Sequence, residues 1–230
     1  MPGSPPPVSS PSTRRPGHQS LYTPLPFRSD DTALAWELLE EIRLATLISN
    51  GERLETSQLP FLIDRERGQH GTLVTHMARP NPQWRALDPA REVVVSALGP
   101  NAYVSPSWYA APRAPTWNYV ALQIRGLPRV IDDAAWCRQA VLRLGRTMEP
   151  PGTGFSVDEL KDDYLDALSK GIVGIEIEVS SVEVQLRLSQ QYDEDHRERV
   201  RRAFEAGSLR ERQVAEAIAR FAQRAGKTAP

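Results

Sequence analysis

The sequence predicts an α+β protein in which an antiparallel β-barrel carries helices at its periphery and at its C-terminus. Three observations predict this fold class. Short apolar or alternating segments follow one another closely between residues 45 and 131, which favours a barrel over a sheet with helices between its strands. Two further alternating segments lie between residues 174 and 188, and residues 193–225 have helical periodicity. No repeat or linker divides residues 21–230, so we expect a single domain with C-terminal helices.

The chain begins with a segment that is too poor in apolar residues to bury a core. Residues 1–20 are mostly Pro, Ser and Gly, with Arg14 and Arg15. Such a composition predicts a disordered tail. Ordered structure is expected from about Leu21, where the prolines of the next segment favour an extended chain.

The first elements are predicted from their caps and turns. Asp30 or Asp31 can cap a helix that runs to about Arg43. Asn50-Gly51 is a strong hairpin signal between strands at 45–49 and 58–64. A strand at 71–78 is followed by a short helix at 82–87, which Asn81 can cap and which has Pro at its first position.

The remaining elements follow from the alternation of apolar residues and from caps. A turn at Gly99-Pro100 is expected between two strands. Asp132 or Asp133 can open one helix, and Ser156 and Ser208 each begin a capping-box pattern. The predicted strands are 92–98, 102–108, 117–125, 127–131, 174–179 and 182–188, and the predicted helices are 132–147, 156–170, 193–206 and 208–225.

Composition excludes several function classes. A net charge of −1 lacks the positive excess of nucleic-acid-binding domains, so a nucleic-acid partner is not expected. The single cysteine, Cys137, excludes an internal disulfide and a multi-cysteine zinc site, and it is expected to be a small core residue of an amphipathic helix. No apolar run is long enough to span a bilayer or to form a signal peptide, so we expect a cytoplasmic protein without membrane contact.

Three segments hold most of the aromatic side chains that have a polar tip. They are residues 71–84, 101–109 and 115–119, and their composition is typical of a pocket for a large flat ligand. Of the four histidines, His18 lies in the tail, His196 on a charged helix face and His70 in a turn. His76 lies inside a predicted strand and leads into the first segment. Alone, a strand histidine is more often a core residue than a ligand.

These segments resemble the PaiB family of FMN-binding transcriptional regulators. The resemblance is carried by motifs in one order over residues 21–205: Tyr22-Thr-Pro24, His76-Met-Ala-Arg-Pro-Asn-Pro-Gln-Trp84, Gly99–Tyr109, Pro115-Thr-Trp-Asn-Tyr119, Gly171–Ile177 and Leu188-Ser-Gln-Gln191. It implies a split β-barrel of the flavin-reductase and pyridoxamine-oxidase type. It further implies a homodimer that holds its ligand at the subunit interface.

The sequence also departs from the family pattern within these ligand segments. Asn101 stands where the family commonly has His, Gln191 replaces an Asn, and the loop 110–114 is short and lacks a lysine. The pattern resembles a branch of the family that binds haem b instead of FMN, the piperazate synthases. The resemblance implies cyclisation of N5-hydroxy-L-ornithine to L-piperazic acid with loss of water, for nonribosomal peptide biosynthesis. The alternatives are a PaiB-type FMN-binding regulator and a flavin-dependent oxidoreductase.

The resemblance assigns roles to individual residues. His76 is the expected axial iron ligand, because the family places this histidine in the cofactor pocket. Arg79 could reach haem propionates or an FMN phosphate, although a surface salt bridge is equally expected for it, and each tryptophan could instead belong to the core. The expected cofactor contacts are His76, Arg79, Asn81, Gln83, Trp84, Trp108 and Trp117. Tyr103 and Tyr119 are the candidates for proton transfer, and Ser105, Asn118, Gln190 and Gln191 for substrate contact, the two glutamines from the partner subunit.

Overall fold

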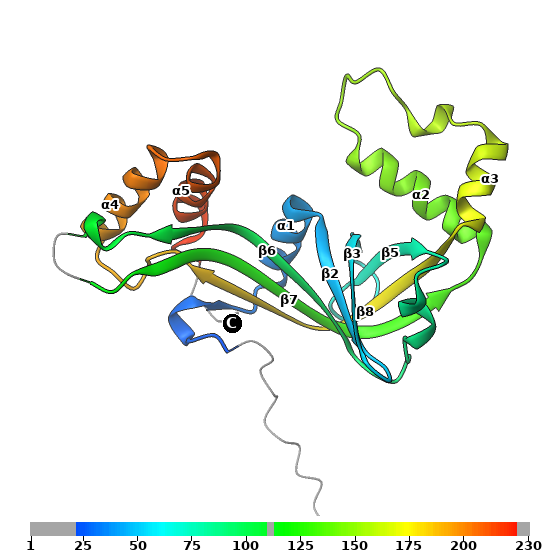
Figure 1. The fold of residues 1–230 in the computed structure, drawn as a ribbon, viewed down its shortest axis with the longest axis horizontal. Coiled ribbons are helices and arrows are strands. Elements are labelled where there is room, and N and C mark those ends of the chain that lie inside the picture. The colour runs from blue at the N-terminus through cyan, green and yellow to red at the C-terminus, as the bar shows by residue number, and fades with distance from the viewer. Residues whose placement is uncertain (1–21, 110–112, 225–230) are drawn as a thin grey trace, which may run out of the picture.

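The chain folds around one eight-stranded antiparallel sheet. The computed structural model describes residues 22–109 and 113–224, so the predicted tail lies outside the described residues. The strand order is β3-β2-β6-β7-β8-β5-β4, and β1 pairs with β8. The sheet is strongly curled, which gives the half-barrel seen in Figure 1. The strands are β1 (Arg28–Ser29), β2 (Leu44–Asn50), β3 (Leu54–Pro60), β4 (Leu62–Asp64), β5 (Thr72–Ala78), β6 (Val93–Val104), β7 (Thr116–Ile131) and β8 (Ile172–Arg187).

Helices lie at both ends of the sheet and at its middle, which confirms the α+β class. In Figure 1, α4 and α5 lie at one end of the long strands, α2 and α3 at the other, and α1 between them. Asp31 caps α1, and Ser208 with Glu211 forms the predicted capping box of α5. The helices are α1 (Thr32–Ile42), α2 (Ala134–Met148), α3 (Asp162–Lys170), α4 (Glu194–Glu205) and α5 (Leu209–Phe221), and the short 3-10 helices are η1 (Leu25–Phe27), η2 (Pro82–Ala86), η3 (Pro106–Trp108) and η4 (Val157–Glu159).

Three pairs of predicted strands are single long strands. The expected turn at Gly99-Pro100 is wrong, because these residues form an irregularity within β6, between Leu98 and Asn101. β7 and β8 are likewise continuous, with a register shift at Gly126. A Cβ on Gly126 would lie 2.3 Å from the carbonyl oxygen of Glu178, so this glycine allows the two backbones to approach closely.

The helix predicted from Ser156 to Lys170 is also wrong in its first part. The Ser156 hydroxyl accepts from the backbone N–H of Asp158 and caps only η4. Leu160 and Lys161 have extended backbone angles, and the helix α3 begins at Asp162. A capping pattern fixes where a helix can begin, but not how far it continues.

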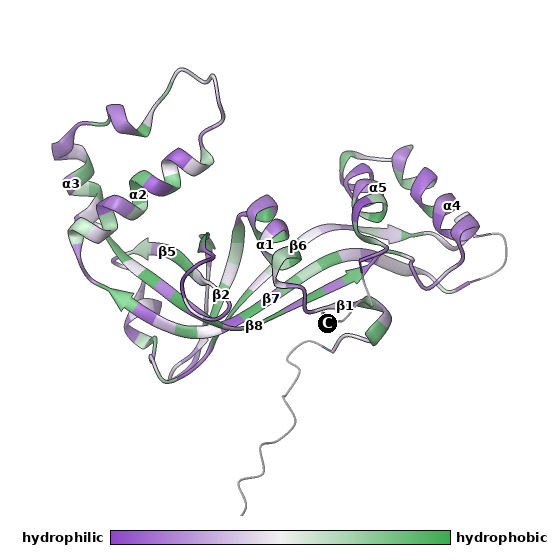
Figure 2. Cartoon of the chain, turned by 180° about the vertical axis from the view of Figure 1, so that it is seen from behind, coloured by the Kyte–Doolittle hydropathy of each residue, from purple (hydrophilic) through white to green (hydrophobic). Residues whose placement is uncertain are grey.

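Alternation along β7 divides the sheet into two faces. Even-numbered residues such as Val120, Leu122 and Ile124 are buried and form the core with α1, α4 and α5. We call the opposite side the outer face. It carries the odd-numbered residues of β7 from Trp117 to Ile131 and their register partners. Figure 2 shows hydrophobic and hydrophilic bands following one another along β7 and β8. Of the helices in residues 22–109 and 113–224, none has the length and apolar composition needed to cross a membrane.

Candidate functional site

His76 lies on the outer face of the sheet with a free imidazole. It sits near the end of β5 and pairs with Gly174, which in turn pairs with Ile131 of β7. The side chain is half-buried, and this burial lowers the pKa of the imidazole. Within the described part of the chain it makes no hydrogen bond. A neutral imidazole with unbonded ring nitrogens has the properties required of a metal ligand.

Trp136 of α2 packs on Gly174, the register partner of His76, on the same face. A Cβ built on Gly174 would lie 2.1 Å from the indole ring of Trp136, so only a glycine lets the ring lie against the strand there. Local sequence patterns did not predict this contact. The available signal was Gly174 itself, because a glycine inside a strand often marks close approach of another group.

A cluster of arginines and carboxylates continues the outer face beyond Gly174. Glu176 is buried, and both of its oxygens accept from Arg67, at 2.9 and 2.7 Å, while Arg129 donates to one of them. The Arg67 hydrogen bonds hold the pKa of Glu176 below its usual value. Asp64 pairs with Arg143 of α2 at 2.5 Å.

The cavity that this cluster lines is small. It lies between α2 and the sheet and has a volume of about 170 Å³. Trp136 and Val74 form apolar parts of its wall, and Val74 is two residues from His76 on the same face. Pockets for cofactors usually measure roughly 300–1,000 Å³. The cavity could therefore hold only part of a haem or flavin.

Arg79 is bound within the fold. Its guanidinium pairs with Asp132 at 2.6 and 3.1 Å and donates to the backbone carbonyls of Lys170 and Ile172. These bonds fasten the end of β5 to the segments that enter α2 and β8. The structure thus shows the surface salt bridge expected as the alternative role of Arg79, and its contact with a cofactor stays a prediction.

Asn81, Gln83 and Trp84 hold the segment after β5 in place. The Asn81 side chain caps η2 and donates to Ser57. Gln83 is only 2% exposed, and its amide nitrogen donates to oxygens of the β2–β3 hairpin. The Trp84 indole N–H donates to the Arg79 carbonyl, and Arg85 lies over the ring.

Tyr103, Trp117 and Tyr119 gather at the other end of the outer face. Trp117 and Tyr103 are register partners, 49% and 46% exposed, and their rings meet edge to face at 6.3 Å. Tyr119 is half-buried and pairs with Asn101 and Arg187. Gly174, the register partner of His76, pairs with Ile131 of β7. Ile131 lies twelve positions along β7 from Tyr119, a distance of roughly 40 Å in an extended strand. The aromatic end and the His76 end of one chain therefore do not meet.

The other predicted contacts lie mainly at the α4 end of the sheet. Trp108 packs edge to face on Phe204 of α4 at 5.0 Å. Asn118 is 1% exposed and exchanges hydrogen bonds with the Ser189 hydroxyl. Gln190 donates to the carbonyls of Pro26 and Leu186 and accepts from a backbone N–H. Ser105 caps η3, and Gln191 is exposed.

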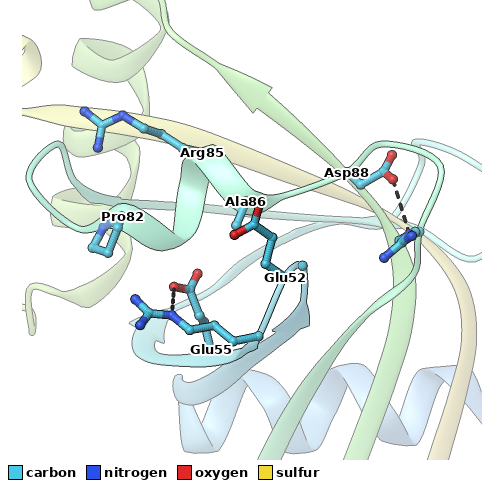
Figure 3. A pocket seen from close by; sticks show the side chains of 9 residues that line it. Glu52, Glu55, Pro82, Arg85, Ala86 and Asp88 are labelled. Carbon is cyan, nitrogen blue, oxygen red and sulfur yellow. Dashed lines mark hydrogen bonds and ion pairs between the residues drawn. The ribbon is translucent and has the colours of Figure 1, made fainter.

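A hollow lies between the β2–β3 hairpin and η2 (Figure 3). Its volume is about 730 Å³, and a neighbouring hollow of about 420 Å³ shares Arg53, Glu55 and Pro82 with it. We call the two together the hairpin groove. Asn81 and Gln83 line its second part. Two of the predicted cofactor residues thus border a hollow of ligand size.

The curled half-barrel and its helices place the protein among the flavin-binding split-barrel folds. The chain belongs to the family described as "Putative FMN-binding domain", whose model matches residues 21–181. It is similar to the protease synthase and sporulation protein PAI 2 of Bacillus subtilis, with 28% identity over 176 residues that cover 76% of this chain and 84% of that protein. An uncharacterized protein of Emericella nidulans is 28% identical over 66% of this chain and 75% of its own length.

Solved structures share the fold at low sequence identity. The FAD and heme binding protein from Mycobacterium smegmatis has a TM-score of 0.54 and 19% identity, with 74% of this chain and 78% of that chain covered. The flavocytochrome Anf3 from Azotobacter vinelandii has a TM-score of 0.52 and 14% identity, with 74% of each chain covered. These likenesses confirm the predicted split barrel.

Proposed function

We propose that the protein is a haem-dependent piperazate synthase, which cyclises N5-hydroxy-L-ornithine to L-piperazic acid and water. The observation that carries the proposal is His76, whose imidazole is half-buried, favoured in its neutral form and free of hydrogen bonds to the described residues. An axial haem ligand needs a neutral imidazole with one ring nitrogen free to bind iron. His76 therefore fits the role of the iron ligand of haem b, and the cavity of about 170 Å³ near it leaves most of the macrocycle to be enclosed by a second subunit.

The complete site requires two subunits. His76 and the pair of Tyr103 and Trp117 share one face of the sheet but lie at opposite ends of β7. A homodimer that packs two outer faces in opposite directions brings the aromatic end of one chain to His76 of its partner. The large exposed area of Tyr103 and Trp117 would then be covered.

The chain's own groups have defined tasks in the reaction. When bound, haem supplies a Lewis-acidic iron that makes N5 of the substrate more electrophilic. The α-amine must lose its proton before its lone pair can close the ring, and the departing hydroxyl must gain one to leave as water. We assign these proton transfers to the phenol groups of Tyr103 and Tyr119. Covering the outer face would also exclude water and hold the substrate folded.

The first test is the absorption spectrum of the protein expressed with a haem precursor, compared with His76→Ala and His70→Ala. We expect a Soret band that is lost or shifted only in His76→Ala, since His70 lies in a turn outside the strand. Incubation with N5-hydroxy-L-ornithine should then give piperazic acid. A Soret band indifferent to His76→Ala would refute the ligand assignment. A two-banded flavin spectrum would instead favour the FMN-binding regulator or oxidoreductase that the family membership suggests.

The second test separates a shared site from a site within one chain. His76→Ala and Trp117→Ala subunits should each form inactive homodimers. In a mixed dimer, one of the two sites combines the intact His76 of one subunit with the intact Trp117 of the other. Coexpression of the two variants should therefore restore activity and one haem per dimer. Mixed dimers without activity would contradict the shared site.

A further inference from the structure

The hairpin groove contains two buried side-chain acceptors without a hydrogen-bond partner among the described residues. They are Oε2 of Glu55 and Oε1 of Gln83. The Gln83 amide cannot be turned around, because its nitrogen already donates to the carbonyls of Leu47 and Glu55 and to the Ser49 hydroxyl. A buried acceptor without a partner costs free energy. Something that donates hydrogen bonds would remove this cost.

The positive charges around the groove already have partners. Arg53 pairs with the other oxygen of Glu55, at 3.2 Å, and Arg91 pairs with Asp88. Arg85 lies over the ring of Trp84, and Figure 3 shows it pointing away from the space between the hairpin and η2. Arg53 and Arg91 are thus engaged through Nε, and Arg85 through the face of its guanidinium.

Glu52 adds a carboxylate to these acceptors. It is exposed at the tip of the hairpin and makes no ion pair or hydrogen bond to the residues that the structure describes. In Figure 3 the Glu52 carboxylate lies next to Ala86, and the side chains of Glu52 and Glu55 both extend from the hairpin toward η2. The hairpin tip reaches η2 because Gly51 has no side chain, and a Cβ there would lie 3.1 Å from that of Ala86. Glu52 and Glu55 therefore form an acidic wall of the groove.

From these contacts we infer that the hairpin groove binds a small organic cation through its N–H groups, such as the ammonium group of a primary amine. Glu52 and Oε2 of Glu55 accept from the ammonium, and Oε1 of Gln83 accepts from a further donor in the adjoining hollow. Haem propionates and a flavin phosphate are anionic, so neither suits this wall. The site is thus distinct from the proposed haem site at His76 and does not depend on the proposed function.

The test uses ¹⁵N-labelled full-length protein and three probes that differ in one property each. n-Butylammonium carries charge and N–H donors, tetramethylammonium carries charge without N–H donors, and acetate carries the opposite charge. We expect n-butylammonium alone to give saturable shifts of the backbone amides of Gly51, Glu52 and Glu55. Equal shifts with tetramethylammonium, saturable shifts with acetate, or no saturable shift at all would overturn the inference.

Matched variants locate the response. Glu52→Gln keeps the shape of the side chain but removes the charge, and we expect it to weaken n-butylammonium binding about tenfold. Glu66→Gln makes the same change at an exposed residue outside the groove, and should leave binding unchanged. Equal affinity in the wild type and Glu52→Gln would overturn the assignment of the wall. Because the titration needs neither haem nor substrate, its failure would leave the proposed synthase activity standing.

Discussion

Gly174→Ala should disturb the contact between α2 and the sheet beside His76. The new Cβ would lie 2.1 and 2.5 Å from two ring carbons of Trp136, whereas carbon atoms normally rest roughly 3.5–4.0 Å apart. The indole or the whole of α2 must therefore move by more than about 1 Å. Overpacking of this kind costs about 1–3 kcal/mol. For a chain of this size, we expect a decrease in melting temperature of about 2–12 °C.

A double-mutant cycle tests the cause of this loss. Unfolding in urea gives the free energies of the wild type, Gly174→Ala, Trp136→Ala and the double variant. If the ring is the obstacle, Gly174→Ala should cost close to nothing in the Trp136→Ala background. Gly171→Ala is the control, because Gly171 has helical backbone angles at the end of α3. An unchanged cost in the Trp136→Ala background, or none in the wild type, would refute the packing argument.

Three further predictions concern charge, a buried hydrogen bond and a helix cap. Burial lowers the pKa of His76 in the folded state only, so the free energy of unfolding should fall as pH decreases below about 6.5. In cofactor-free protein, His76→Leu should therefore reduce the change in the urea midpoint between pH 7.5 and 5.5. Asn118→Ala should cost about 1–3 kcal/mol because it strands the buried Ser189 hydroxyl, and adding Ser189→Ala should recover part of that loss in the same assay. Ser208→Ala should cost about 1 kcal/mol by removing the cap that Glu211 completes, and an unaltered midpoint would contradict the capping role.

The sequence predicted elements where the determining interactions are local. The Asp31 cap, the Asn50-Gly51 hairpin and the Ser208 capping box depend on residues within a few positions of one another. The sequence divided each long strand into two because Gly99-Pro100 and Gly126 are residues that favour turns when only their neighbours in sequence are considered. Within the sheet, pairing on both sides of each irregularity holds the strand continuous.

The predicted site residues show a second limit of local patterns. Arg79, Gln83 and Gln190 were expected to contact ligands, yet each donates to backbone carbonyls. The same side-chain N–H groups can donate hydrogen bonds to a ligand or to a backbone carbonyl. Which role applies depends on carbonyls that only the folded chain brings near.

The distance along β7 decides how the remaining candidates can work together. Motifs that lie within 50 residues of one another in sequence appeared to describe one pocket, but an unbroken strand of 16 residues places His76 and Trp117 at opposite ends of the outer face. No side-chain movement spans roughly 40 Å. Either the two ends serve different ligands or a second chain joins them. The proposed shared site would account for the exposed aromatic end and for the His76 imidazole without hydrogen bonds to the described residues, since each end would complete the other across a two-fold axis.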